Sequence, residues 1–322
     1  MKKNKLILIL SIVCILSIVS NFSGCIKKIP EDPNTHIRNI IFDGIDRSYR
    51  IHIPENLSIN NEPSLLFVLH GGGGDAEGME LLVTQGGFNK ISDENNLIVV
   101  YPNGYEKNWN DGRNKNDSSY QENIDDVGFI SQIIDDLIQE FNIDQNKVYC
   151  TGISNGAMMS YRLSLDISEK IAAIAPVAGS IPVEIFPEET GGIPVSICII
   201  FGTSDPLVPF EGGIVGTKNN PRGTVISVPK SIDYWVNRNN CDKTPDSINL
   251  PNENIFDFCR VRKDTYANGT NGTEAVFFEI ARGGHTWPSG PQYLPKILVG
   301  RTCYDIDANT VIWDFFINHP KN

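Results

Sequence analysis

The stretch from Val148 to Met158, VYCTGISNGAM, constrains the fold of this chain more than any other. It passes from a β-prone run through Gly-Ile-Ser-Asn-Gly, residues 152–156, into a segment with helical character. A G-x-S-x-G sequence between a strand and a helix predicts a sharp turn that projects the central serine hydroxyl from the edge of a sheet. Unpaired N–H groups at the start of the helix favour negative charge beside that hydroxyl. The motif therefore marks Ser154 as a candidate nucleophile.

The N-terminus has the pattern of a secretory signal peptide. Three lysines within the first five residues precede an apolar run, Leu6 to Val19, that is too short to span a bilayer. The following Phe22-Ser23-Gly24-Cys25 resembles a lipoprotein cleavage box, in which the Cys25 thiol receives the lipid. We expect residues 1–24 to be a signal peptide and Cys25 the lipid attachment site, with the protein held at the outer face of the cell membrane. Plain secretion and an uncleaved N-terminal anchor are the alternatives.

The net negative charge of the chain argues against nucleic acid and other anionic polymers as partners. The chain has 27 basic and 39 acidic side chains, and residues 1–24 contain three lysines and no acids, so removal of that segment leaves 24 − 39 = −15. A strongly acidic protein repels nucleic acid and other anionic polymers. A neutral substrate is the better expectation, and the membrane is a partner only through a lipid on Cys25.

The pattern of apolar runs predicts an α/β fold. Two short β-prone runs around Asp43-Gly44 predict an antiparallel hairpin at one sheet edge. Beyond them, buried strands alternate with amphipathic helices, which indicates a mostly parallel sheet covered by helices on both faces. The expected strands are Leu65–Leu69, Leu97–Tyr101, Val148–Cys150, Ile171–Val177, Ile193–Phe201 and Glu274–Ile280. The expected helices are Ala76–Glu94 with a break at Gly86-Gly87, Phe129–Phe141, Ala157–Leu163, Lys230–Asn239 and Ala308–Phe316.

Four reactive side chains fall at the ends of predicted strands, namely His70, Ser154, Asp205 and His285. In a parallel sheet the carboxyl ends of the strands lie at one edge, and reacting groups gather there. A serine nucleophile needs a base to take its proton and an acid to orient that base. The strand ends therefore predict where such groups meet.

Chain order selects the base and the acid. In folds with this elbow the order is nucleophile, acid, histidine, and only His285 and His319 follow Ser154. His319 lies near the fraying C-terminus, so we assign His285 as the base, the alternative being a surface histidine in a Gly-rich turn. Asp205 follows a strand and is the expected acid, although Asp-Pro is also a common turn pair. Glu211 and Asp264 are weaker candidates for the acid.

Backbone N–H groups are expected to bind the oxyanion of the reaction. The N–H of Asn155 follows the nucleophile, and a second donor is expected from Gly71 or Gly72, in the run His70-Gly71-Gly72-Gly73-Gly74. Glycines there let the backbone approach a ligand closely. His70 is then an anchor for the glycine loop and not a base.

Six separate motifs resemble one family. The sequence resembles the polyhydroxybutyrate depolymerase and feruloyl/acetylxylan esterase group (carbohydrate esterase family 1-like) of the α/β-hydrolase superfamily. The resemblance spans about Arg38 to His319, and it implies an α/β-hydrolase catalytic domain over residues 38–322 after a spacer at 25–37. It also implies a triad of Ser154, Asp205 and His285. The motifs are HGGGG from His70, WNDGR from Trp109, DDVGF from Asp125, GISNGAM from Gly152, GTSD from Gly202 and GHTWP from Gly284.

The resemblance also suggests substrate-binding residues. Trp109 and Asn110 match positions that could line the acyl or alcohol pocket, and Trp287 could form an aromatic wall beside the base. The alternative is that each residue only packs its loop. Asp125 and Asp126 are both candidates for the cap of the helix that follows, and Asp126 is preferred because the helix is expected to begin right after it.

Together these features predict a secreted or surface-anchored serine esterase. The expected substrates are short-chain acyl esters, feruloyl or acetyl esters of polysaccharide, or hydroxyalkanoate oligoesters. A peptidase of the same fold and a non-catalytic binding protein that retains the triad are the alternatives. Neither a metal nor an organic cofactor is implied, because the histidines are scattered and not spaced as ligands.

Five cysteines lie beyond Cys25. Cys150 and Cys198 occur in apolar strand-like runs and are expected to be buried. Cys241, Cys259 and Cys303 fall in loop-like segments, and in an exported protein two of them could form a disulfide. Cys241 with Cys259 closes the shortest loop, but the sequence does not choose among the three pairings.

Overall fold

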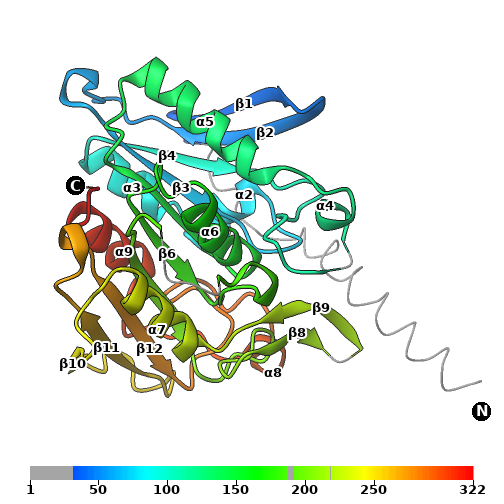
Figure 1. Cartoon of the computed structure of the whole chain (residues 1–322), viewed down its shortest axis with the longest axis vertical. Coiled ribbons are helices and arrows are strands. Elements are labelled where there is room, and N and C mark those ends of the chain that lie inside the picture. The colour runs from blue at the N-terminus through cyan, green and yellow to red at the C-terminus, as the bar shows by residue number, and fades with distance from the viewer. Residues whose placement is uncertain (1–31, 116, 188–191, 218, 322) are drawn as a thin grey trace, which may run out of the picture. The chain divides into compact units, whose positions relative to one another are not determined.

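A single mixed sheet of ten strands organises the part of the chain that the computed structural model describes, residues 32–115, 117–187, 192–217 and 219–321. Its strands are β1 (Thr35–Phe42), β2 (Ile45–His52), β3 (Ser64–Leu69), β4 (Leu97–Pro102), β5 (Val148–Ile153), β6 (Ala173–Val177), β7 (Ser196–Gly202), β10 (Asp246–Asn249), β11 (Arg260–Tyr266) and β12 (Ala275–Ala281). Their spatial order is β1-β2-β4-β3-β5-β6-β7-β12-β11-β10 (Figure 1). The strands from β4 to β12 in this order run parallel to one another. The predicted mostly parallel sheet is therefore confirmed.

The N-terminal hairpin is also present as predicted. β1 and β2 pair antiparallel, with Phe42 opposite Ile45. Between them Asp43 and Gly44 both have positive φ angles, of 51° and 75°. Two such residues form the tight turn that matches the twist of the flanking strands. β1 begins at Thr35, within the segment that the sequence predicts to be a spacer.

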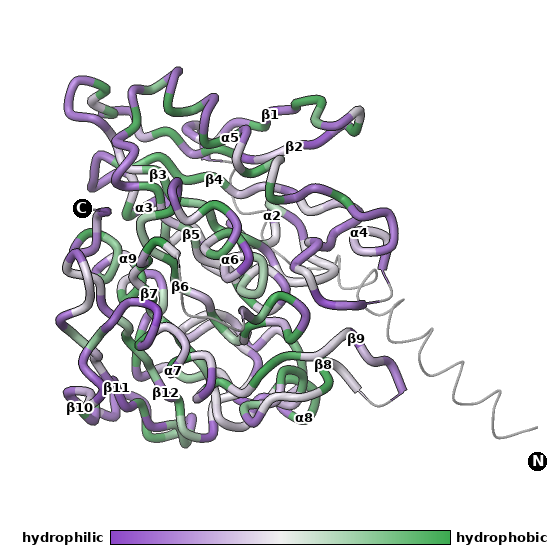
Figure 2. Tube along the Cα trace, viewed as in Figure 1, coloured by the Kyte–Doolittle hydropathy of each residue, from purple (hydrophilic) through white to green (hydrophobic). Residues whose placement is uncertain are grey.

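Helices cover both faces of the sheet. They are α2 (Ala76–Gly78), α3 (Gly87–Glu94), α4 (Ser118–Gln121), α5 (Asp126–Phe141), α6 (Asn155–Asp166), α7 (Val228–Arg238), α8 (Lys296–Val299) and α9 (Ala308–Ile317). Side chains of α5, α6 and α7 pack into one apolar core, and side chains of α3 and α9 pack into a second core. Within β3, Leu65 and Phe67 enter the first core while Leu66 and Val68 enter the second. Alternation between two buried faces explains the continuous apolar run of this strand, and the central strands are apolar in Figure 2.

The helix predicted over residues 76–94 is broken as expected. A π-helical turn, η2 (Met79–Val83), follows α2, and α3 begins at Gly87. Gly86 has a φ of 67°, which an α-helix does not contain. The glycine pair therefore ends one helical segment and permits the next.

Four strands have no counterpart in the sequence prediction. β10 and β11 extend the sheet beyond β12, and β8 (Gly213–Thr217) pairs with β9 (Asn220–Val225) in a separate hairpin. β10 is the edge strand of the sheet with β11 beside it, and the four strands contain many exposed residues, so they lack the buried apolar runs of the central strands.

The residues expected to form the signal peptide and the lipid attachment site, 1–24 and Cys25, lie outside the described residues. Within residues 32–321, as far as the structure describes them, no helix is both long enough and apolar enough to cross a membrane.

Candidate active site

The elbow between β5 and α6 holds Ser154 in a strained conformation. Its φ of 57° and ψ of −115° lie outside the regions that residues with a side chain normally occupy. The flanking glycines make the turn possible. A Cβ atom at Gly156 would lie 2.4 Å from the Leu69 oxygen, and a Cβ at Gly152 would lie 2.7 Å from the Gly156 carbonyl carbon. The turn leaves the Ser154 side chain partly exposed at the carboxyl end of β5.

Asp205 and His285 meet at the same edge of the sheet. Asp205 follows β7, His285 follows β12, and the two strands are parallel neighbours. His285 Nδ1 lies 2.6 Å from Asp205 Oδ2, and both residues are buried. The other carboxylate oxygen, Oδ1, accepts the backbone N–H groups of Leu207 and Val208, each at 2.8 Å. The carboxylate is thus fixed on one side by backbone and accepts the Nδ1 proton on the other, which leaves Nε2 free to act as a base.

Backbone hydrogen bonds continue along this edge from Ser154 to β12. Ser154 N–H donates to Val177 O at 3.0 Å, and Ala178 N–H donates to Ile200 O at 3.0 Å. Thr203 N–H then donates to Ile280 O at 3.0 Å. The ends of β5, β6, β7 and β12 are therefore held in register. Among the hydrogen bonds of the described residues, none joins Ser154 Oγ to His285.

Gly71 and Gly72, one of which is expected to donate to an oxyanion, lie against the elbow around Ser154. A Cβ at Gly71 would be 3.6 Å from Ser154 Cβ, and one at Gly72 would be 3.6 Å from Asn155 Cβ. Within the described chain, the N–H groups of Gly71, Gly72 and Asn155 donate no hydrogen bond to another protein group. The N–H groups of Gly73 and Gly74, by contrast, are bonded to Lys107 O and Gly71 O. The free donors are therefore those next to Ser154.

His70 holds the glycine loop in place. Its Nε2 accepts the Gly104 N–H at 2.9 Å, so the proton of the neutral ring is on Nδ1, which donates to Gly71 O at 2.8 Å. Burial lowers the pKa of His70 to about 4. Both ring nitrogens are used by backbone groups, which agrees with the prediction that His70 is an anchor and not a base.

The lowered pKa predicts a pH dependence of stability. The unfolded chain binds a proton at His70 below about pH 6.5 and the folded protein binds it only near pH 4. The contribution of His70 is therefore complete above pH 6.5 and decreases as pH falls toward 4, by roughly 3 kcal/mol in total. Urea unfolding of the wild type and of His70→Gln across this range measures the difference. If the free energy of unfolding depends on pH in the same way for both proteins, the prediction is contradicted.

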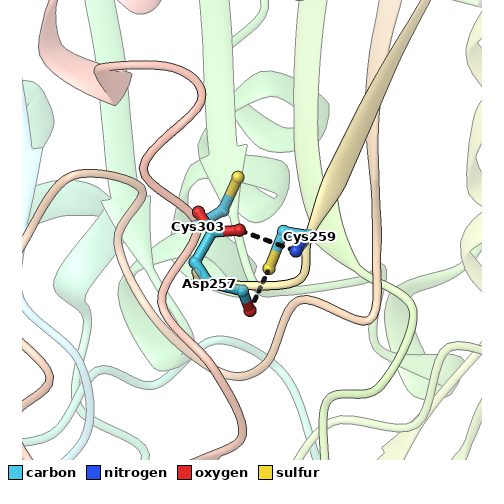
Figure 3. A group of neighbouring side chains, drawn as sticks. All are labelled: Asp257, Cys259 and Cys303. Atoms are coloured by element: carbon cyan, nitrogen blue, oxygen red, sulfur yellow. Dashed lines mark hydrogen bonds between the residues drawn. The ribbon is translucent and has the colours of Figure 1, made fainter. Parts of the chain in front are cut away.

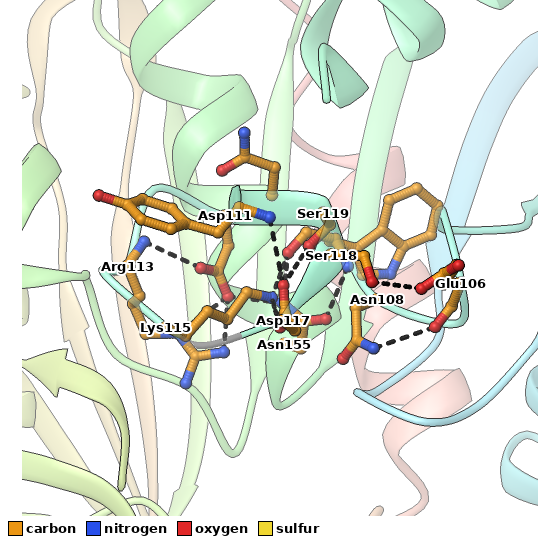
Figure 4. A network of polar contacts seen from close by, with 12 residues as sticks. Glu106, Asn108, Asp111, Arg113, Lys115, Asp117, Ser118, Ser119 and Asn155 are labelled. Carbon is orange, nitrogen blue, oxygen red and sulfur yellow. Dashed lines mark hydrogen bonds and ion pairs between the residues drawn. The ribbon is translucent and has the colours of Figure 1, made fainter. Parts of the chain in front are cut away.

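The Asn155 side chain connects the elbow to the long loop that precedes α4 (Figure 4). Its Oδ1 accepts the Trp109 N–H at 2.8 Å, while Nδ2 donates to Trp109 O at 3.1 Å and to Asp111 Oδ2 at 2.5 Å. Burial opposes ionisation of Asp111, but Arg113 and Lys115 beside it hold its pKa below the usual range. The sequence pattern predicts a role only for the backbone N–H of Asn155, and this side-chain network was missed. The charged residues at alternate positions, Asp111, Arg113 and Lys115, were the available signal.

The three residues suggested for substrate binding are buried. Trp109 is fully buried, and its Nε1 donates to His70 O at 2.9 Å. Asn110 donates from its side chain to Ile124 O at 3.0 Å. Trp287 packs in the second apolar core, and its Nε1 donates to Asn309 Oδ1 at 3.2 Å. These contacts favour the loop-packing alternative for all three.

Asp126 does not cap α5, so that prediction was wrong. The cap is Asp125, whose side chain accepts the Gly128 N–H at 2.8 Å. Asp126 is buried, pairs with Arg47 at 2.5 Å and accepts the Asn110 N–H at 2.7 Å. It therefore supports the same loop as Asn155 does.

The rejected candidates for the base and the acid have other partners. His319 pairs with Glu274, which immediately precedes β12 and so lies at the opposite end of that strand from His285. Asp264 lies within β11 opposite Phe277, and it pairs with Arg262 and accepts the Ser247 hydroxyl. Glu211 is an exposed residue in a turn.

Comparison with known proteins is consistent with this geometry. The model of a family described as phospholipase/carboxylesterase matches residues 58–219. A protein of Nocardia uniformis subsp. tsuyamanensis that is named as an esterase, NocK, is 28% identical over 309 residues, which cover 93% of this chain and 87% of the relative. A protein of Aspergillus flavus named "Probable feruloyl esterase C" is 29% identical over 64% of this chain and 72% of its own length. The solved structure of an acetyl xylan esterase from Aspergillus awamori is 15% identical, with a TM-score of 0.53 over 78% of this chain and 94% of its own. That structural likeness confirms the α/β-hydrolase fold.

Proposed function

This chain belongs to the phospholipase/carboxylesterase family and is a carboxylic ester hydrolase, and we propose that it acts through a triad of Ser154, His285 and Asp205. The observation that carries the proposal is the 2.6 Å contact between His285 Nδ1 and Asp205 Oδ2, at the sheet edge where the elbow presents Ser154. The contact fixes the imidazole tautomer that a serine base requires.

In the proposed mechanism, His285 Nε2 takes the proton of the Ser154 hydroxyl as the oxygen attacks the ester carbonyl. The carbonyl oxygen becomes an oxyanion, which the N–H groups of Asn155 and of Gly71 or Gly72 stabilise. The protonated His285 then gives its proton to the alcohol that leaves. Water, deprotonated by the same imidazole, attacks the acyl-enzyme and releases the acid. Asp205 remains ionised and stabilises the imidazolium.

A peptidase or a non-catalytic binding protein would use the same scaffold differently. The free N–H groups of Gly71, Gly72 and Asn155 support a catalytic role, because a binding protein has no need of donors aimed beside a strained serine. The esterase names of the relatives support ester over amide substrates.

For the substrate, we favour neutral esters of polysaccharide with a feruloyl or acetyl group, or hydroxyalkanoate oligoesters. The feruloyl esterase name of one relative supports the first class. The net charge of −15 that remains without residues 1–24 supports a neutral substrate over an anionic one. We further propose that the protein works at the outer face of the membrane, attached through Cys25.

Fluorophosphonate labelling tests the proposed nucleophile directly. The reagent reacts with a serine only where a base activates it, so we expect one stable adduct on the peptide that contains Ser154. Peptide mass spectrometry locates the adduct. Ser204→Ala is the matched control, because Ser204 is an exposed serine beside the acid, and this variant is expected to label as the wild type does. An adduct on another serine, or none, would reject the triad.

A substrate panel separates the remaining alternatives. Feruloyl, acetyl and 3-hydroxybutyryl esters are compared by kcat/KM with peptides of matched length. Faster hydrolysis of one ester class identifies the acyl group. Preference for the peptides would support the peptidase, and equal rates for the wild type and Ser154→Ala on every substrate would support the binding protein.

A further inference from the structure

Two cysteines from distant parts of the chain lie together outside the proposed active site. Cys259 directly precedes β11, and Cys303 lies between α8 and α9. Their sulfur atoms and a carboxylate oxygen of Asp257 all lie within 4.8 Å of one another (Figure 3). Both cysteines are buried, and both belong to the second apolar core.

The backbone around the pair is well fixed. Asp257 Oδ1 accepts the Cys259 N–H at 2.7 Å, and Asp257 Oδ2 accepts the Tyr304 N–H at 2.7 Å. One carboxylate thus connects the residue next to Cys303 with Cys259 itself. This bridge holds the two segments at a constant separation.

We propose that Cys259 and Cys303 form a disulfide when the protein is in an oxidising environment. The other cysteines are placed differently. Cys241 packs in the first apolar core beside Thr273, and Cys150 contacts Ser160 on α6. Cys198 lies within the central strand β7. Of the three pairings left open by the sequence, the structure favours Cys259 with Cys303 over either pairing with Cys241.

A bound metal ion is the competing use of these thiols. The described residues offer three donors here, two sulfurs and Asp257, and both oxygens of Asp257 already accept backbone N–H groups. A structural zinc site normally has four protein ligands. A disulfide needs only the two sulfur atoms. It therefore accounts for the cluster without a fourth ligand and without the Asp257 carboxylate.

The oxidation exchanges one disulfide for another. Because both thiols are fully buried in the folded protein, the exchange takes place while the chain folds, when the thiolate of Cys259 is still accessible to solvent. This thiolate attacks a sulfur of an external disulfide, such as glutathione disulfide, and one glutathione thiolate leaves. Cys303, after losing its proton, attacks Cys259 Sγ in the mixed disulfide and displaces the second glutathione. The protein loses two hydrogens, and the oxidant becomes two thiols.

The proposed bond would support the loop that carries His285. Val299 O accepts the His285 N–H at 2.6 Å, Arg301 O accepts the Gly284 N–H at 2.8 Å, and Cys303 O accepts the Ser289 N–H at 2.8 Å. The segment from Val299 to Cys303 therefore supports the loop that carries His285 through backbone hydrogen bonds. A disulfide between Cys303 and Cys259 would link this segment covalently to the residue that precedes β11.

Peptide mapping of the purified protein tests the pairing. The protein is folded in a glutathione redox buffer, treated with a chelator, alkylated under denaturing conditions and digested without reduction. We expect a crosslinked peptide pair that contains Cys259 and Cys303, while Cys150, Cys198 and Cys241 are alkylated. Crosslinks to Cys241 instead, or alkylation of both Cys259 and Cys303, would overturn the proposal. Stoichiometric zinc in protein not treated with chelator, together with two free thiols, would also overturn it.

Thermal unfolding provides a second readout. Closing a loop between residues 259 and 303 is expected to raise Tm by about 5 °C relative to the reduced protein. Cys303→Ser removes this difference between oxidised and reduced protein, and Cys241→Ser, the matched control at another buried cysteine, preserves it. An equal Tm for oxidised and reduced wild type would contradict the inference.

Discussion

Ser154→Ala is expected to lower kcat for ester hydrolysis by at least about 10⁴-fold, because the variant has no oxygen to form the acyl-enzyme. The activity that remains comes from the backbone donors and from substrate binding, which the substitution leaves in place. KM should change little for the same reason. Steady-state kinetics with a p-nitrophenyl ester measures both constants.

The fold should tolerate this substitution. Ser154 has a positive φ that alanine shares with difficulty, but its side chain makes no hydrogen bond among the described residues, so its loss breaks none. An unchanged Tm would separate loss of chemistry from loss of structure. Ser204→Ala, at an exposed serine near the acid, should retain wild-type kcat. A Ser154→Ala variant that keeps more than about a tenth of the activity would reject Ser154 as the nucleophile.

Asp205→Asn is expected to lower kcat by about 10³- to 10⁴-fold through the orientation of His285. The backbone N–H groups of Leu207 and Val208 require an oxygen at the Oδ1 position, so the asparagine must direct its NH₂ group toward His285 Nδ1. Nδ1 then accepts a hydrogen bond, and the proton of the neutral ring moves to Nε2. In that tautomer the imidazole cannot take the proton of Ser154.

Asp264→Asn is the matched control for this prediction. Asp264 is the other buried aspartate that the sequence allows as the acid, but it lies on β11 and pairs with Arg262. We expect this variant to keep kcat within a few fold of the wild type. A large loss of kcat in Asp264→Asn with little loss in Asp205→Asn would reverse the assignment of the acid.

Turns and breaks that depend on glycine are local features of the sequence and could be predicted. The break at Gly86-Gly87 and the Asp43-Gly44 turn were predicted correctly, because each depends on backbone conformations that glycine permits. Of the two candidates for the cap of α5, Asp125 and Asp126, the preferred one was wrong, because the cap is Asp125. Two adjacent aspartates offer the same side chain to a helix start, and only the partner of the second one, Arg47 from β2, distinguishes them.

The residues suggested for substrate binding were misjudged for a different reason. Trp109, Asn110 and Trp287 have the chemistry of pocket residues, yet their side chains bond to backbone or to buried groups. Their partners, such as His70 and Asn309, are far away in the sequence. Residue type alone did not distinguish contact with substrate from support of a loop.

The fold class, the elbow around Ser154 and the identities of the strand-end side chains could be predicted from the amino-acid sequence, because buried strands and glycine turns follow from local pattern and backbone sterics. Three further contacts became visible only in the folded chain: the hydrogen bond between His285 and Asp205, the hold of the Asn155 side chain on the Trp109 loop, and the position of Cys259 beside Cys303 rather than beside Cys241. Each of these pairs is joined across many intervening residues. Such contacts depend on the order of strands in the sheet and on the packing of loops at its edge, which no local pattern specifies.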